Sequence, residues 1–123
     1  HGAAGCPCVV EIKSAADARD GLALFPDAPT SRGRRHLLEL ADLAERGIRA
    51  AVIFAVQRAD GRALAVNRPI DPEFAAALEQ VAGRGVEVYA YRCPLTTAGI
   101  ALAEEIPVLL TAEQAAAWRP PEP

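Results

Sequence analysis

The chain has 123 residues and a net charge of −3; 51% of its residues are apolar and 24% are charged. This length and composition predict one globular domain and exclude a disordered chain, and no apolar run reaches the roughly 18 residues that a membrane span needs. The acidic balance argues against a surface that is basic overall, although a local basic patch can still bind nucleic acid.

The cysteines and the first residues of the chain indicate the cellular location of the protein. Cys6, Cys8 and Cys93 lack zinc-binding spacing, and their odd number favours reduced thiols in a cytoplasm. The chain contains no Met and opens without a signal peptide. We therefore expect a cytoplasmic piece of a longer protein that makes no membrane contact.

The first predicted element is a β-strand over residues 8–16. Its alternation places Val10 and Ile12 on one face and Glu11 and Lys13 on the other. The strand therefore carries two charged side chains next to each other.

A hairpin and a helix are predicted next. An Asp-Gly turn at 20–21 followed by an apolar run over 22–25 indicates a hairpin or bulged turn back along the strand over 8–16. Thr30 or Ser31 can cap a helix whose apolar residues recur at helical spacing until Gly47.

Strands and helices alternate in the rest of the chain. The expected elements are a buried central strand over 50–56, an exposed loop over 57–69, a helix from Asp71 to Gly83 or Gly85, and strands over 86–91 and 108–110. This order predicts an α/β fold with a mixed central sheet flanked by helices.

Glu11 and Lys13 are the first candidates for chemistry. Side by side on a strand, a carboxylate can hold a divalent cation while an ammonium stabilises developing charge. PD-(D/E)xK nucleases use this arrangement, with a second acid on the preceding strand completing a Mg²⁺ site. The alternative is a solvent-facing ion pair of small energetic weight, which the spacing alone favours.

A basic segment at the predicted helix start is the second candidate. Helix N-termini attract phosphate, so Thr30, Arg32, Arg35 and His36 are expected to contact phosphate or nucleic acid. Arg58 ends the central strand, where a side chain can project into a cleft. The alternatives are that Thr30 only caps the helix, the arginines are solvated and His36 packs.

Five motifs in order resemble the C-terminal part of the sugar fermentation stimulation protein A (SfsA) family. They are V-E-x-K-S, L-x-x-F-P-D-A-x-T-x-R-G-x-x-H-L-x-E-L, A-x-x-x-F-x-V-Q-R, D-P-x-F and G-V-E-V-x-A-Y-R-C. The resemblance covers about residues 9–110, and several separate blocks carry it together.

The resemblance implies a PD-(D/E)xK restriction-endonuclease-like domain over residues 1–111, with a tail or short helix over 112–123. It implies DNA as the partner, a regulatory role in sugar (maltose) metabolism, and an OB-fold domain upstream. Glu11 and Lys13 stand at the catalytic E-x-K positions. The preceding acid would lie upstream of His1, and Asp27 is the residue here that can join Glu11 in holding Mg²⁺ or Mn²⁺.

Three functions therefore remain open. The first is a DNA-binding module with a nuclease-like site and no turnover, which we favour for this chain. The second is a Mg²⁺-dependent DNA endonuclease, in which Glu11 holds the metal and Lys13 stabilises the charge on phosphorus. The third is a non-catalytic domain that supports the OB-fold.

Overall fold

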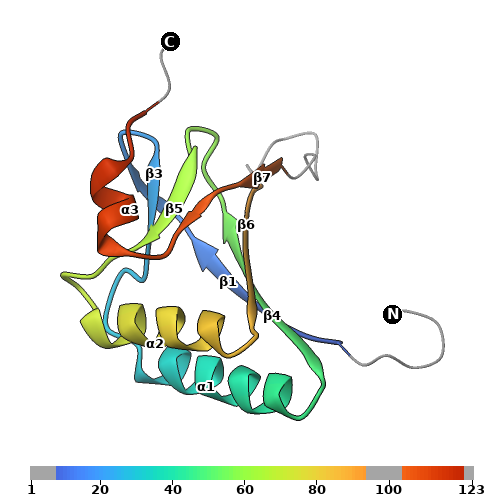
Figure 1. Cartoon of the computed structure of the whole chain (residues 1–123). Coiled ribbons are helices and arrows are strands. Elements are labelled where there is room, and N and C mark those ends of the chain that lie inside the picture. Colours follow the sequence, from blue (N-terminus) through green and yellow to red (C-terminus); the bar gives the residue numbers. More distant parts are fainter. Residues whose placement is uncertain (1–7, 94–103, 121–123) are drawn as a thin grey trace.

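The computed structural model describes residues 8–93 and 104–120, which form two four-stranded mixed sheets and three helices (Figure 1). In chain order the elements are β1 (Cys8–Ala15), β2 (Asp17–Arg19), β3 (Leu22–Phe25), α1 (Ser31–Glu45), β4 (Arg49–Val56), β5 (Ala63–Val66), α2 (Pro72–Gly83), β6 (Glu87–Arg92), β7 (Glu104–Ile106), β8 (Val108–Leu109) and α3 (Ala112–Ala117). The α/β class predicted from the alternation of elements is confirmed.

The first sheet has the order β1-β4-β6-β7, and the second has the order β2-β3-β5-β8. In the first, β1, β4 and β6 are parallel and β7 is antiparallel. In the second, β2 and β3 form a hairpin at the predicted turn, β5 pairs in parallel with β3, and β8 pairs in parallel with β5. The expected return along the strand over 8–16 is wrong, because β1 pairs with β4 and the short strand β2 is the partner of β3. Strand β4 therefore lies inside its sheet, as its continuous apolar run predicts.

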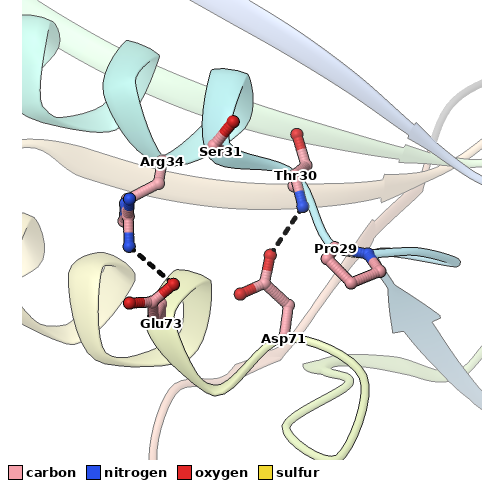
Figure 2. Close-up of a pocket in the computed structure, with 6 residues that line it drawn as sticks. All are labelled: Pro29, Thr30, Ser31, Arg34, Asp71 and Glu73. Atoms are coloured by element: carbon pink, nitrogen blue, oxygen red, sulfur yellow. Dashed lines mark hydrogen bonds and ion pairs between the residues drawn. The ribbon is translucent and has the colours of Figure 1, made fainter.

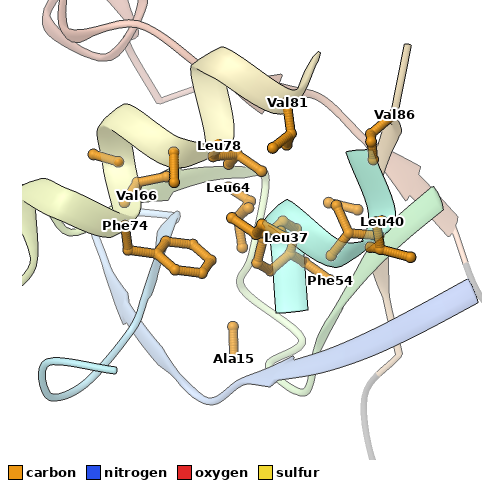
Figure 3. Close-up of a cluster of buried hydrophobic side chains, with 14 of the residues drawn as sticks. Ala15, Leu37, Leu40, Phe54, Leu64, Val66, Phe74, Leu78, Val81 and Val86 are labelled. Carbon is orange, nitrogen blue, oxygen red and sulfur yellow. The ribbon is translucent and has the colours of Figure 1, made fainter. Parts of the chain in front are cut away.

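One face of the first sheet is covered by α1 and α2, which lie side by side (Figure 1). Figure 3 shows the core between the sheet and these helices, where Phe54 of β4 packs with Leu37 of α1 and with side chains of α2. Phe54 is fully buried, and its ring centroid lies 5.3 Å from that of Phe25. Phe25 in turn lies 5.3 Å from Phe74, so three aromatic rings join both sheets to α2.

Both long helices begin at the caps that the sequence predicts. The Thr30 hydroxyl accepts a hydrogen bond from Gly33 N at 2.9 Å, and the Asp71 carboxylate accepts one from Phe74 N at 2.9 Å. Pro72 follows Asp71 at the first helical position, where its missing N–H costs no hydrogen bond. Local sequence thus fixes where α1 and α2 start.

The exposed loop predicted over residues 57–69 is wrong in its second half. Residues 63–66 form β5, which is buried along its length between β3 and β8. The segment has only four residues, all of them apolar and small enough to pack on both faces, so it shows no period-2 alternation. Tertiary pairing with β3, and not a local pattern, makes it a strand.

The C-terminal part of the described chain contains α3, which lies within the tail or short helix predicted over 112–123. Its N-cap Thr111 and Gln114 form a reciprocal capping box. Cys8 and Cys93 carry free thiols, whereas Cys6 lies outside the described residues. No helix in residues 8–93 and 104–120 is long and apolar enough to cross a membrane.

Candidate functional site

Strand β1 turns Glu11 and Lys13 towards the helices. Glu11 pairs in register with Val52 of β4 and Lys13 pairs with Phe54. Because paired residues of parallel strands point to the same face, the two charged side chains share the face that carries the buried core. The opposite face of β1 is open, with Ile12 64% exposed.

His36 of α1 completes a three-residue cluster with this pair. The Lys13 ammonium lies 3.7 Å from Glu11 Oε2 and 3.4 Å from His36 Nδ1, and His36 Nδ1 lies 3.6 Å from the same carboxylate oxygen. The Lys13 side chain is only 11% exposed, against 36% for Glu11 and 24% for His36. The pair is therefore not the solvent-facing ion pair of the alternative interpretation; it lies partly covered beneath α1.

Arg32 and Arg35 flank His36 on α1. Arg32 precedes His36 by four residues, which places the two on the same side of the helix, and Arg35 is its neighbour in sequence. Both arginines are exposed, and neither makes an ion pair or side-chain hydrogen bond within the part of the chain that the structure describes. In contrast, Arg34 on the other side of the helix pairs with Glu73 at 2.8 Å.

Thr30 and Arg58 have partners of their own. The Thr30 hydroxyl is engaged by Gly33 N in capping α1. Arg58 donates two hydrogen bonds to the Asp60 carboxylate, at 3.0 and 2.9 Å, and these bonds raise the pKa of Arg58 and lower the pKa of Asp60. The Arg58 guanidinium is therefore engaged by Asp60.

Asp27 is exposed and borders a separate pocket with Asp17, Arg19 and Asn67. Among residues 8–93 and 104–120, no three His, Cys, Asp or Glu side chains are placed to hold one metal ion. Asp27 thus does not form such a group with Glu11 and His36. Its expected role as a metal ligand stays a prediction.

A pocket at the N-termini of α1 and α2 explains how the helix that carries His36 is held (Figure 2). Asp71 is only 6% exposed, and its carboxylate accepts hydrogen bonds from Thr30 N at 2.8 Å and from Phe74 N. One side chain therefore joins the starts of both helices. Sequence reasoning identified Asp71 as a cap of α2 but missed its bond to Thr30, because the two residues are 41 positions apart.

A family model described as "Sugar fermentation stimulation protein RE domain" matches residues 2–99. The chain belongs to the sugar fermentation stimulation protein family. Its curated relatives include the sugar fermentation stimulation protein homologues of Chloroflexus aurantiacus, 50% identical over 101 residues, and of Moorella thermoacetica, 50% identical over 104 residues. These matches cover 82% and 85% of this chain but only 39% and 45% of the relatives.

A solved structure of this family has a similar fold. It is described as Pyrococcus furiosus SfsA in complex with Ca²⁺, and it matches with a TM-score of 0.76 and 31% sequence identity. The match covers 81% of this chain and 44% of that chain. The chain therefore spans less than half the length of the family members it matches, and the fold expected from the resemblance is confirmed.

Proposed function

We propose that this chain is the phosphate-facing domain of a DNA-binding protein. The observation that carries the proposal is the arrangement around His36, where Lys13 lies beneath α1 and Arg32 and Arg35 extend from the same helix without acidic partners in the described residues. Arginines whose charge is not neutralised by the protein can bind phosphate oxygens, and they release counterions when they do so.

The arrangement favours binding to a phosphate backbone over recognition of base sequence. Guanidinium groups on one helix, such as those of Arg32 and Arg35, can contact neighbouring phosphates, which fixes orientation and carries no sequence information directly. The net charge of −3 is compatible with this role, because Arg32 and Arg35 form a local basic patch on α1. Binding without turnover also suits a regulator of sugar metabolism, the role suggested by the family resemblance.

Salt-dependent binding of a short fluorescein-labelled DNA duplex, followed by fluorescence anisotropy, tests the proposal. Each lost phosphate contact lowers the slope of log K against log salt by about 1, so the double variant Arg32→Ala/Arg35→Ala should lower it by about 2. Arg84→Ala is the control, because this half-buried arginine is neutralised by Glu45 and Asp42. Equal slopes for wild type and the double variant would contradict the proposal.

Metal-dependent cleavage is a second candidate, favoured by the description of the P. furiosus relative as a Ca²⁺ complex. Glu11 offers the hard carboxylate oxygen that Mg²⁺ or Mn²⁺ prefers. However, no group of three or more His, Cys, Asp or Glu side chains in the described residues is placed to hold a metal ion, so we derive no cleavage step. Nicking of plasmid DNA that needs Mg²⁺ or Mn²⁺ and is lost in Glu11→Ala would establish this candidate over binding alone.

A further inference from the structure

The ammonium of Lys13 lies close to two different acceptor groups. Glu11 Oε2 is 3.7 Å away on the same strand, and His36 Nδ1 is 3.4 Å away on α1. We propose that His36 is a positioning residue, whose Nδ1 accepts a hydrogen bond from Lys13 and holds the ammonium beside Glu11. The contact between His36 and Lys13 does not depend on what the protein binds, whereas its consequence for phosphate binding rests on the proposed function.

Burial gives Lys13 a reason to need this acceptor. An ammonium has three donors and no acceptor, and a charged group removed from water is stable only when its donors are paired. The Lys13 side chain is 11% exposed, so α1 has displaced most of its water. Glu11 supplies an opposite charge at 3.7 Å, and His36 is the side chain of α1 within hydrogen-bond reach to supply an acceptor.

The proposed hydrogen bond needs one particular tautomer of the imidazole. His36 Nδ1 lies 3.4 Å from the Lys13 ammonium and 3.6 Å from Glu11 Oε2, so a proton on Nδ1 would face the carboxylate and leave no lone pair for Lys13. The proposal assigns the proton to Nε2, which leaves the Nδ1 lone pair free to accept from the ammonium.

The position of His36 is itself fixed by the fold. The next residue, Leu37, is fully buried in the core, and the helix start is tied down by Thr30 and by Asp71. His36 therefore cannot follow Lys13 if the lysine moves. Without the acceptor, the flexible four-carbon stem of Lys13 would be free to leave Glu11 and take its charge into solvent.

The sequence allows this contact to be measured directly, because Lys13 is the only lysine in the chain. At one fixed pH, acetylation by a water-soluble amine-reactive ester can be followed by mass spectrometry, with the N-terminal α-amino group as an internal standard. Loss of the His36 acceptor should expose Lys13, and we expect His36→Ala to accelerate its acetylation about fivefold, the factor that corresponds to one ordinary hydrogen bond. Glu39→Gln, an exposed position one turn further along α1, should leave the rate unchanged.

Two conservative variants separate hydrogen bonding from simple steric cover. The Oδ1 atom of Asn can occupy the place of His Nδ1, whereas the polar end of Gln reaches nearer to Nε2. Asn is also smaller than Gln, so steric cover alone would make Lys13 react faster in His36→Asn than in His36→Gln. The proposal predicts the opposite order, with His36→Asn close to wild type; equal rates or the steric order would overturn it.

DNA binding by the same variants keeps the two proposals apart. If positioning and the proposed function both hold, His36→Gln weakens duplex binding and His36→Asn does not. If the labelling order holds while duplex binding is absent or unchanged, positioning stands and the proposed function fails. If the labelling order fails while the Arg32 and Arg35 variants still lower the salt slope, the positioning role is overturned and the proposed function stands.

Discussion

Replacement of Asp71 by Ala should destabilise the protein more than any surface substitution near the same pocket. The Asp71 carboxylate is buried and accepts hydrogen bonds from Phe74 N at 2.9 Å and from Thr30 N at 2.8 Å. The first bond caps α2. The second, drawn in Figure 2, holds the residue that caps α1. Alanine removes both acceptors and leaves both backbone N–H groups without their partner.

The expected loss can be worked out from the two bonds. Removal of an N-cap carboxylate costs about 1 kcal/mol, and a partly buried donor that loses a charged acceptor costs roughly 1–2 kcal/mol more. Asp71→Ala should therefore lower the free energy of unfolding by about 2–3 kcal/mol. Asp71→Asn keeps one acceptor oxygen but turns an amide N–H towards the other donor, so we expect about half that loss.

Urea denaturation followed by circular dichroism measures both losses, provided that the m-value stays constant. Glu73→Ala is the matched control in the same pocket, because this side chain is 74% exposed and its ion pair with Arg34 should contribute no more than about 0.5 kcal/mol. If Asp71→Ala cost no more than Glu73→Ala, the claim that one carboxylate joins the starts of both helices would be refuted.

Three other predictions concern the helix start, the sheet and the core. Gly33→Ala should destabilise the protein by about 1–2 kcal/mol in urea denaturation, because a Cβ there would lie 2.9 Å from the Thr30 hydroxyl and this clash outweighs the better helix propensity of alanine. Gly83→Ala is the control and should be neutral or stabilising, because a Cβ there would meet nothing within 4 Å. Equal effects of the two substitutions would contradict this steric reasoning. Hydrogen bonds from Arg49 and then Tyr89 lower the pKa of Glu87 from 4.5 to about 2, so the stability they provide is present above pH 4.5 and is lost as the pH falls towards 2. Glu87→Gln should therefore reduce the loss of stability between pH 7 and pH 3, and an unchanged loss would show that Glu87 does not cause it. In the core, Phe54→Ala should cost roughly 3–5 kcal/mol and Phe54→Leu less than about 2 kcal/mol in the same assay, whereas similar losses would mean that the aromatic core is loosely packed.

Local signals in the sequence predicted the elements that local chemistry determines. The caps at Thr30 and Asp71 are short-range hydrogen bonds to residues three positions later, so their pattern is visible in the sequence. The central strand over 50–56 was recognised for a similar reason, since its apolar run is continuous. The four-residue strand β5 has no such signal and depends on pairing with β3.

The candidate site was predicted in part. The spacing of Glu11 and Lys13 showed that they share a face, but alternation alone cannot tell which face of a strand the helices will cover. The apolar residue Ile12 is on the open face, opposite to the usual pattern. His36 was expected near phosphate, yet its contact with Lys13 joins residues 23 positions apart and follows from the packing of α1 on the sheet.

The most direct test of the central claim is to locate bound DNA on the protein. In a titration of the ¹⁵N-labelled chain with a short DNA duplex at low salt, backbone amide shifts report which surface the DNA touches. The proposed function predicts the largest changes at Lys13, at His36 and at the arginines beside it on α1. Changes centred instead on Ile12 and the open face of β1, or no changes at all, would contradict the proposed function.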